Sequence, residues 1–335
     1  MSAITPTPLA AEPIVEEAKA IAEKLKDARA AIAEVIFGQE TVVERALTTV
    51  LAGGHGLLVG VPGLAKTKLV DTMGTVFGLL ANRIQFTPDL MPSDILGSEI
   101  LDESADHKRS FRFVKGPVFA QLLMADEINR ASPRTQSALL QSMQEHFVTI
   151  AGQRHDLPKP FHVLATQNPI ELEGTFPLPE AQLDRFLMQV DVLYPDVEAE
   201  RRMLFETTGA EEAKARTVLS AEELMQAQQL VRRMPVGEAV VESILKLVRS
   251  LRPGEAIPSV GEHIAWGPGP RASQALMLTV RARALLDGRF APSLDDVEAL
   301  AIPTLQHRMA VTFAARAAEG VTVRDLISSA LKAVL

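Results

Sequence analysis

The fold of this chain is decided by residues 60–67, which read Gly60-Val61-Pro62-Gly63-Leu64-Ala65-Lys66-Thr67. The stretch follows a short apolar run at 57–59 and precedes a helical pattern at 68–77, so its order is strand, loop and helix. Such a loop suits phosphate groups, because glycines let the backbone approach while successive N–H groups and the helix dipole attract negative charge. The stretch therefore predicts a nucleotide-binding loop. A chance Gly/Pro turn between strand and helix is the alternative.

Two side chains of this loop have direct roles in the prediction. Lys66 would place a positive charge against the β- and γ-phosphates, and the Thr67 hydroxyl would ligate Mg²⁺. The usual pattern has glycine at position 65, where this chain has Ala65. Alanine is small enough to leave the approach open, so we predict that residue 65 does not need a positive φ. The predicted nucleotide contacts are Gly60, Val61, Pro62, Gly63, Leu64, Ala65, Lys66, Thr67 and Lys68.

A second motif, Asp126 and Glu127, follows an apolar run that ends at residue 125. Adjacent carboxylates at the end of a buried strand are costly unless a cation uses them. We predict that Asp126 holds Mg²⁺ together with Thr67, and that Glu127 orients and deprotonates the water that attacks the γ-phosphate. An Asp-Glu pair by itself is more often a solvated strand end. Its coupling to the loop favours the catalytic interpretation.

Three further side chains are candidates for catalysis. Asn168 ends a strand predicted to begin at residue 162, where it would hydrogen-bond the attacking water; an Asn-Pro turn is the alternative. Arg185 and Arg271 are predicted to stabilise the charge that phosphoryl transfer spreads over the equatorial oxygens. An isolated arginine is usually a surface charge, and that alternative stays open for both residues.

Short apolar runs alternate with helical patterns through the first two thirds of the chain. The runs lie at 57–59, 83–86, 118–124, 162–165 and 188–193. This alternation predicts an α/β fold in which helices flank a mainly parallel sheet. Two segments, at about 98–114 and 147–157, alternate in the manner of β-hairpins and are predicted to be insertions on that core.

Strand signals cease beyond residue 195, and helix-capping patterns replace them. Ser or Thr is followed three residues later by Asp or Glu at 220–223, 293–296 and 322–325. We therefore predict a flexible segment at 1–14, an α/β nucleotide-binding core at 15–195, and a smaller all-helical domain at 196–335.

Composition excludes several classes of protein. The 335 residues are 47% hydrophobic and 23% charged, which is typical of a soluble globular protein. With no cysteine, the chain has neither disulfides nor thiolate metal sites, and its seven histidines show no metal-ligand spacing. The formal net charge of −8 disfavours broad contact with nucleic-acid phosphates. No apolar run is long enough for a membrane span and no signal peptide is evident, so a cytoplasmic location is expected.

Taken together, these motifs resemble the AAA+ ATPases, and specifically the MoxR family, over about residues 30–335. The resemblance rests on Phe37-Gly38-Gln39, the loop 60–67, Asp126-Glu127-Ile128-Asn129-Arg130-Ala131 with Thr135-Gln136-Ser137-Ala138-Leu139-Leu140, Ala165-Thr166-Gln167-Asn168-Pro169 and Leu178-Pro179-Glu180-Ala181-Gln182-Leu183-Asp184-Arg185-Phe186. Ala65, which departs from the general loop pattern, matches this family's own variant. The Gly-Pro-Gly-Pro run before Arg271 departs from the family's more usual Ser-Pro-Arg.

The resemblance also implies a role for each motif. Lys66 and Thr67 would be Walker A, Asp126 and Glu127 Walker B, and Asn168 sensor 1. Arg185 would be an arginine finger given to the neighbouring subunit, and Arg271 a sensor 2 acting in cis. The pair Gly38 and Gln39 would lie near the adenine. The hairpins would be a helix-2 insert and a pre-sensor-1 hairpin facing a pore or partner, and the helical domain would be the lid of a P-loop AAA+ core.

This resemblance implies a chaperone-like ATPase that uses ATP and Mg²⁺ in an oligomeric ring, expected to be a hexamer, to remodel, activate or mature a partner protein. MoxR-like proteins commonly work with a partner that bears a von Willebrand factor A domain, often in metal-cofactor insertion. A chelatase-type motor subunit is the main alternative, and a DNA-dependent AAA+ motor is less favoured by the acidic balance. A nucleotide-gated scaffold without hydrolysis is a further, non-enzymatic alternative.

Overall fold

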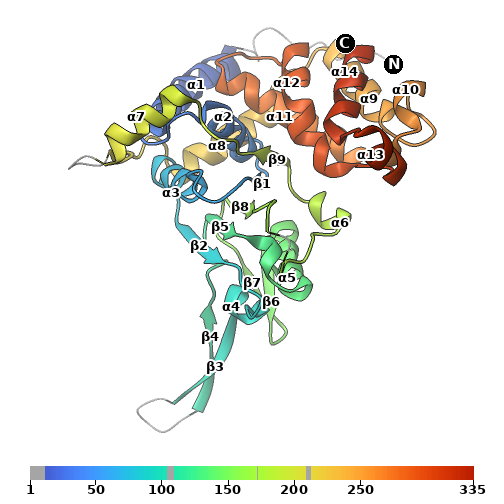
Figure 1. Ribbon diagram of the computed structural model, residues 1–335. Helices are drawn as coiled ribbons and strands as arrows, with labels where there is room; N and C mark the ends of the chain where they lie inside the picture. Colours follow the sequence, from blue (N-terminus) through green and yellow to red (C-terminus); the bar gives the residue numbers. More distant parts are fainter. Residues whose placement is uncertain (1–11, 104–108, 172, 209–212) are drawn as a thin grey trace, which may run out of the picture.

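A parallel β-sheet lies at the centre of the computed structural model, which describes residues 12–103, 109–171, 173–208 and 213–335 (Figure 1). The five strands follow the order β2-β5-β8-β1-β9, and each neighbouring pair is parallel. They are β1 (Gly56–Val59), β2 (Ala81–Gln85), β5 (Leu122–Asp126), β8 (His162–Gln167) and β9 (Met188–Asp191). The predicted α/β fold is confirmed.

One predicted strand is shorter than its apolar run. Of residues 118–124, only those from Leu122 onward belong to β5. Val118 is buried in a turn, where its N–H donates to the carbonyl of Ile95 at 3.1 Å. Gly116 lies against the same carbonyl, since an added Cβ would be 2.3 Å from it. Burial against Ile95 therefore accounts for this apolar segment without strand pairing.

Helices cover both faces of the sheet, because strand side chains alternate between two buried clusters. Leu58, Met124 and Leu164 belong to one cluster, with residues of α1 (Glu12–Ala33), α2 (Glu40–Leu51), α3 (Lys66–Val76) and α8 (Ala221–Arg233). Leu57 and Val163 belong to the other, with residues of α4 (Pro92–Leu96), η2 (Ile128–Arg130) and α5 (Pro133–Glu145). The short α6 (Glu180–Leu183) precedes β9.

Both predicted hairpins are present. Strands β3 (Gly97–Glu103) and β4 (Arg109–Lys115) form one, which projects far from the body (Figure 1). Strands β6 (Phe147–Ile150) and β7 (Gln153–Asp156) form the other. Its turn residues Ala151 and Gly152 have φ values of +49° and +81°, and positive φ at both positions is what a two-residue hairpin turn requires. The two insertions leave the parallel sheet uninterrupted.

Beyond β9 the chain is helical, as predicted, with one addition. The helices are α7 (Val197–Thr207), α8, α9 (Glu238–Ser250), α10 (Pro258–Gly261), α11 (Pro270–Leu286), α12 (Leu294–Leu305), η3 (Gln306–Arg308), α13 (Phe313–Glu319) and α14 (Val323–Val334). All three predicted capping boxes are formed, at the starts of α8, α12 and α14. The addition is a short antiparallel pair, β10 (Ile264–Trp266) with β11 (Ala310–Val311), too brief to show a period in the sequence.

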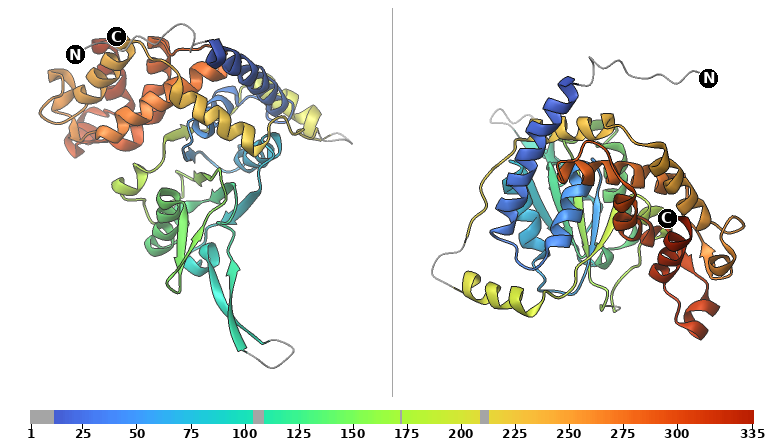
Figure 2. Two further views of the ribbon diagram at one scale, coloured as in Figure 1. Left: turned by 180° about the vertical axis from the view of Figure 1, so that it is seen from behind. Right: turned by 90° about the horizontal axis from the view of Figure 1, so that it is seen from above.

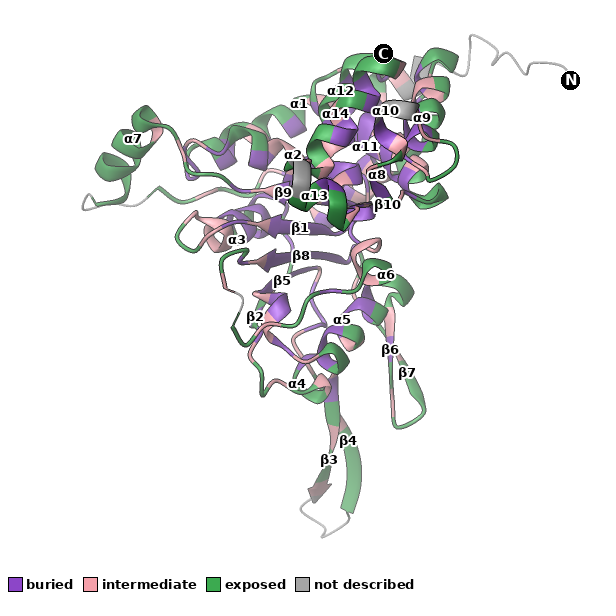
Figure 3. Ribbon diagram, turned by 45° about the vertical axis from the view of Figure 1, so that its right-hand side comes forward, coloured by how far each residue is buried: buried purple, intermediate pink, exposed green. Residues whose placement is uncertain are grey.

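The two predicted domains share one hydrophobic core. Buried residues of α1, α2 and α3 form a single cluster with those of α8, α9, α11 and α12. The right-hand panel of Figure 2 shows the helical region from above, and Figure 3 colours the buried residues purple. The boundary near residue 195 falls between β9 and α7 and stays a prediction. Residues 1–11 of the segment predicted to be flexible lie outside the described residues, and α1 already begins at Glu12.

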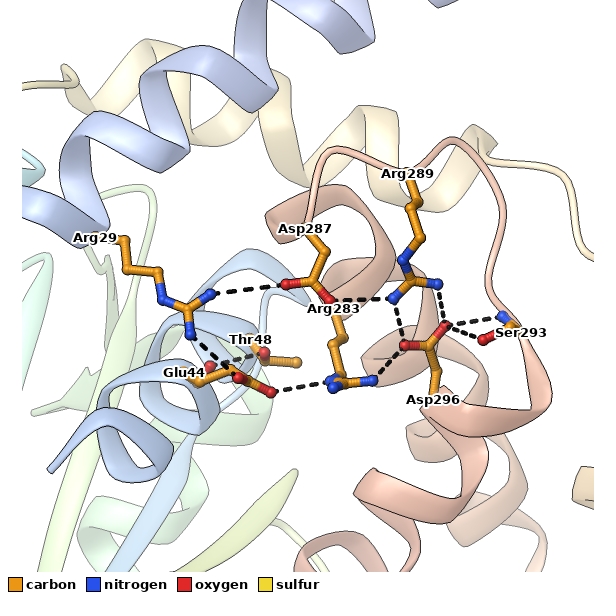
Figure 4. A network of polar contacts seen from close by, with 8 residues as sticks. All are labelled: Arg29, Glu44, Thr48, Arg283, Asp287, Arg289, Ser293 and Asp296. Atoms are coloured by element: carbon orange, nitrogen blue, oxygen red, sulfur yellow. Dashed lines mark hydrogen bonds and ion pairs between the residues drawn. The ribbon is translucent and has the colours of Figure 1, made fainter.

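A buried ion-pair network also joins the two parts (Figure 4). The side chain of Asp296 in α12 is fully buried and accepts hydrogen bonds from Arg283 at 2.7 Å and Arg289 at 2.6 Å. Arg283 also donates to Glu44 of α2 at 2.9 Å. Burial by itself would raise the pKa of Asp296, but hydrogen bonds from Arg289, Ser293 and Arg283 hold it below its usual value. This carboxylate therefore stays charged and fixes α12 against α11. None of the helices in the described ranges has the length and hydropathy that a membrane crossing requires.

Candidate functional site

The loop 60–67 leaves the end of β1 and enters α3 at Lys66. At Gly60 an added Cβ would lie 2.6 Å from the carbonyl oxygen of Val192, so only glycine allows the loop to pack against the segment that follows β9. Gly63 has φ +84° with open space around it. The first glycine is therefore needed for close packing, and the second for backbone conformation.

Our prediction for Ala65 is wrong. The residue has φ +55° and ψ +20°, the left-handed conformation that costs an L-residue with a Cβ roughly 1–2 kcal/mol. It is the N-cap of α3, and the N–H of Leu69 donates to its carbonyl. Ala65 also lines the cavity described below, and strained backbone of this kind is concentrated at functional sites.

Lys66 is folded back onto its own loop. Its Nζ donates to the carbonyl oxygens of Gly60 at 2.5 Å and Val61 at 2.8 Å. Burial lowers the pKa of Lys66, while the nearby carboxylates of Asp126 and Glu127 act in the opposite direction. The ammonium group is thus held by neutral carbonyl oxygens, and anionic oxygens would attract it more strongly.

Asp126 ends β5 with both carboxylate oxygens engaged. Its Oδ1 accepts from the hydroxyl of Thr166 at 2.5 Å, and its Oδ2 pairs with the Arg83 guanidinium at 2.6 Å. Thr166 is nearly fully buried on the neighbouring strand β8. The carboxylate is therefore fixed from two strands, and it is not a solvated strand end.

Glu127 adopts a strained backbone conformation with φ +53°. Its N–H donates to Thr166 Oγ1 at 2.8 Å, so one hydroxyl links Asp126 and Glu127. Its Oε2 accepts from Gln85 at 2.8 Å and from Arg130 at 3.1 Å. The Glu127 carboxylate is thus held through Oε2 by two side chains, and the residue lines the cavity described below.

One cavity, of about 390 Å³, unites the predicted residues of the loop and the two strand ends. We call it the loop cavity; its lining consists of Pro62, Gly63, Leu64, Ala65, Lys66, Thr67, Lys68, Asp126, Glu127, Thr166 and Asn168. Asn168 is buried, and its Oδ1 accepts from the N–H of Ile170 at 3.1 Å. It therefore forms the turn that its Asn-Pro sequence predicts and also lines the cavity. Gly60 and Val61 are outside this lining and contact Lys66 instead.

Arg185 and Arg271 lie elsewhere, in a second cavity of about 270 Å³. This arginine pocket is lined in part by Asp184, Arg185, Arg271 and Arg308, and by residues 53–55, which immediately precede β1. It lies at the amino ends of β1 and β9, whereas the loop cavity lies at the carboxyl ends of β1, β5 and β8. Four residues of β1 separate these ends by roughly 13 Å at 3.3 Å per residue.

Arg271 lies away from the loop cavity, where a role in cis was expected for it, and that role stays a prediction. Arg271 is not among the residues that line the loop cavity of its own chain; its guanidinium lies 3.6 Å from the carboxylate of Asp184 in the arginine pocket. Arg185 donates from its guanidinium to the carbonyl of Leu140 at 2.5 Å. The two arginines thus share one site at the opposite end of the sheet, because α11 begins there with Pro270.

Comparison with known proteins assigns this arrangement to a family. The family model described as ATPase family associated with various cellular activities (AAA) matches residues 55–188, and that of the AAA lid domain matches residues 259–330. Chaperone MoxR1 of Mycobacterium tuberculosis is 42% identical over 290 residues, which cover 86% of this chain and 76% of the relative. The chain belongs to the MoxR family of AAA+ ATPases.

Other relatives of this MoxR-family chain agree. Protein MoxR of Paracoccus denitrificans is 30% identical, over 93% of this chain and 96% of the relative. An uncharacterized Bacillus subtilis protein, YeaC, is 38% identical over 90% and 92%. The crystal structure of an inferred ATPase from Cytophaga hutchinsonii superposes with a TM-score of 0.88 at 35% identity, covering 98% of this chain and 99% of that one. The fold of this MoxR-family chain is therefore shared with a solved structure over nearly its whole length.

Gly38 and Gln39 of this MoxR-family chain lie beside a third cavity, of about 300 Å³, which we call the Tyr194 pocket. It is lined by Gly38, Gln39, Glu40, Thr41, Val42, Arg45, Asp191, Leu193, Tyr194 and Arg324. The Gln39 amide donates to the carbonyl of Leu193 at 2.9 Å. An added Cβ at Gly38, whose φ is +65°, would lie 2.3 Å from the Cβ of Ala199. The pocket follows the carboxyl end of β9, next to the segment on which Gly60 packs.

Sequence reasoning missed four residues that organise the MoxR-family site: Arg83, Gln85, Arg130 and Thr166. Arg83 and Gln85 alternate with buried Ile84 on β2, which pairs with β5, so both face the carboxylates that end β5. The signal available in the sequence was the alternation of polar and apolar residues at 83–85. Thr166 carried a similar signal, as a hydroxyl that directly follows the apolar residues 163–165 of its strand. Its partners depend on the strand order, which the motifs do not specify.

Proposed function

We propose that this MoxR-family chain binds ATP with Mg²⁺ in the loop cavity and hydrolyses it. The observation that carries the proposal is that Lys66, Asp126, Glu127 and Asn168, from three different strand ends, line one cavity. The Thr67 hydroxyl and the Asp126 carboxylate line the same cavity and supply the oxygen ligands that Mg²⁺ takes. A bound Mg²⁺ would neutralise charge on the phosphate oxygens.

The chain's own groups then have defined tasks. Lys66 exchanges the carbonyls of Gly60 and Val61 for phosphate oxygens, whose negative charge attracts the ammonium group more strongly. Glu127 leaves Gln85 and Arg130 and accepts the proton of the attacking water. The amide of Asn168, already buried at the cavity wall, orients that water.

The active site is proposed to be completed by a second copy of the chain. Arg185 and Arg271 lie at the amino ends of the strands, opposite the loop cavity of their own subunit. A head-to-tail arrangement brings the arginine pocket of one subunit to the loop cavity of the next, and repetition closes a ring. We propose that both arginines act in trans and that the ring is a hexamer. The Tyr194 pocket, with Gly38 and Gln39, is proposed to receive the adenine.

We further propose that hydrolysis drives remodelling or activation of a partner protein. One relative is named a chaperone. The β3–β4 hairpin places Leu101 and Phe111 opposite each other, with 55% and 71% of their surfaces exposed, as a site for apolar protein segments. A partner with a von Willebrand factor A domain, action in metal-cofactor insertion and a cytoplasmic location are part of this proposal. A chelatase-type motor subunit is the second candidate.

A DNA-dependent motor fits the hairpin less well. One strand of the hairpin carries acidic residues and the other basic ones, with Glu99 and Asp102 on β3 and Arg109, Arg112 and Lys115 on β4. Arg112 pairs with Asp102 at 2.9 Å. A surface for nucleic-acid phosphates would carry an excess of positive charge.

Glu127→Gln tests the proposed function. Turnover of ATP should fall by about 10²–10⁴-fold, the usual contribution of a general base, while ATP binding is retained. Steady-state phosphate release and equilibrium nucleotide titration measure the two quantities. Glu242→Gln, an exposed residue of α9, is the matched control and should leave both unchanged. Equal turnover in the wild type and Glu127→Gln would refute hydrolysis at this cavity.

The same variant tests the role of the hairpin. Held with ATP, Glu127→Gln rings should retain a client from cell extract, and the added Phe111→Ser change should reduce that retention because it removes the exposed ring. Mass spectrometry of the bound fraction identifies the client. Equal retention with and without Phe111→Ser would contradict the role of the hairpin while leaving the ATPase proposal intact.

A further inference from the structure

Strand β9 is an edge strand of the sheet, and η3 contacts both the strand and the residues that lead into it. Gln306 donates to the carbonyl of Gln189 at 3.0 Å and to the carboxylate of Asp191 at 2.9 Å. The next residue, His307, contacts the carbonyl of Phe186 through Nε2 at 2.9 Å. Together with the next residue, Arg308, these side chains therefore bridge both ends of one core strand.

Arg308 makes most of the contacts at the amino end, with only 3% of its side chain exposed. Its guanidinium donates to the Asp184 carboxylate at 2.9 Å, to the carbonyl of Phe186 at 2.6 Å and to the carbonyl of Leu187 at 3.0 Å. It also donates to the carbonyl of Thr304 in its own helical region. The residues on both sides of Arg185 are thus fixed by one rigid group with a planar fork of donors.

Asp184 extends this contact to the second arginine of the pocket. One of its carboxylate oxygens accepts from Arg308, and the other lies 3.6 Å from the guanidinium of Arg271. Arg271 is more than half exposed, so Asp184 is its partner on an otherwise open side. Arg308 therefore acts on Arg185 through the backbone and on Arg271 through Asp184.

The other end of the bridge reaches the Tyr194 pocket. Asp191, which accepts from Gln306, also pairs with Arg324 of α14, and both Asp191 and Arg324 line that pocket. A ligand that displaced Arg324 or Asp191 would change the contacts of Gln306, two residues from Arg308. Both ends of β9 are thus connected through one short segment of the C-terminal region.

We propose that the segment Gln306-His307-Arg308 is a bridge between two sites of one subunit. It couples nucleotide bound in the subunit's own Tyr194 pocket to the arginines that the subunit offers to its neighbour. Arg308 is the positioning residue for those arginines, Arg185 and Arg271. This rests on the proposed function, in which those arginines complete the neighbouring active site. Because Arg308 is buried, its partners have no water to replace its hydrogen bonds. Loss of its donors leaves an acidic group and backbone carbonyls without their partners beside Arg185.

Mixed rings test the inference. Glu127→Gln subunits have an inactive cavity and an intact arginine pocket, whereas Arg185→Ala subunits have the reverse. An equimolar mixture should hydrolyse ATP where an Arg185→Ala cavity faces a Glu127→Gln neighbour. Replacing the first partner by the double variant Glu127→Gln/Arg308→Lys should reduce this activity by roughly 10²-fold, the usual cost of misplacing a catalytic group by about 1 Å.

The reciprocal mixture separates positioning from general damage. Arg308→Lys subunits with an intact cavity should gain activity when mixed with Glu127→Gln subunits, because the partner then supplies correctly held arginines. ATP binding, thermal unfolding and ring size are measured for each variant. If Arg308→Lys does not assemble, Asp184→Asn replaces it, since that partly exposed carboxylate joins Arg308 to Arg271.

Each result decides between the two levels of the argument. No activity in the Glu127→Gln and Arg185→Ala mixture overturns the shared active site, and the bridge with it. Activity in that mixture that is unchanged by Arg308→Lys on the donor subunit overturns the bridge alone. Loss of activity irrespective of which subunit carries the variant also overturns it, because a purely structural role has no donor side.

Discussion

The two ends of the central sheet differ in how their residues are assembled. At the carboxyl end, the loop cavity is built from short contiguous motifs, and two of its residues, Ala65 and Glu127, have strained left-handed backbones. At the amino end, Arg185, Arg271 and Arg308 come from three separate segments of the chain. Buried neutral histidines lie near the amino end, whereas carboxylates line the cavity at the carboxyl end.

This difference teaches how the proposed reaction is divided. In the proposed function, the groups at the carboxyl end hold a nucleotide and activate water, and those at the amino end stabilise negative charge. A parallel sheet separates these ends by the length of its strands, so one chain cannot bring them to the same phosphate. In the proposed ring, each end would therefore be one half of a site.

Arg185→Ala should have the largest effect on ATP turnover, and it tests the role proposed for the amino end. We expect turnover to fall by about 10³–10⁵-fold with ATP binding retained, because an arginine finger acts on the charge of the transition state. Single-turnover hydrolysis and nucleotide titration measure these quantities. Arg249→Ala, an exposed arginine of α9, is the control. Undiminished turnover in Arg185→Ala would mean that the amino end takes no part in hydrolysis.

The buried histidines should give the next effect, on stability. Burial lowers the pKa of His55 to about 3 and of His162 to about 4, and it holds the pKa of His307 well below its ordinary value. His55 accepts the N–H of Val163 at one nitrogen and contacts the Met143 carbonyl at the other, so a second ring proton would break a buried hydrogen bond.

The sign follows from these lowered pKa values. Below about pH 6.5 the unfolded chain binds protons that the folded chain excludes, so the free energy of unfolding should decrease as pH falls from 6.5 to 5. The expected slope is about 1.4 kcal/mol per pH unit for each histidine. Urea unfolding across this range measures it, and His162→Gln should remove one share of the slope. Stability that does not change with pH would show that these side chains are not buried and neutral.

Ala65→Gly should have the smallest effect, and it tests whether the backbone at the carboxyl end is strained. Relief of the left-handed strain should raise the free energy of unfolding by about 0.5–1 kcal/mol. Ala20→Gly, at an exposed position within α1, is the matched control and should lower it by about 1 kcal/mol. Chemical denaturation of both variants provides the measurement. A loss of stability in Ala65→Gly comparable to that control would show that the alanine is not strained.

Much of the fold could be predicted because its signals are local. The strand, loop and helix around residues 60–67, both hairpins and the three capping boxes follow from residue periods and from side chains that satisfy nearby amides. The apolar run at 118–124 was misjudged because burial against Ile95 uses the same residue types as a strand. The φ of Ala65 was misjudged because side-chain size does not report the backbone geometry that a cavity imposes.

By itself, the sequence determined the α/β class, the nucleotide loop and the carboxylates that face it, since each depends on residues a few positions apart. Only the tertiary structure decided that Arg271 lies with Arg185 and not at its own loop, that Thr166 links Asp126 to Glu127, and that Arg308 bridges to β9. These contacts join residues far apart along the chain. They depend on strand order and helix packing, which no local motif specifies.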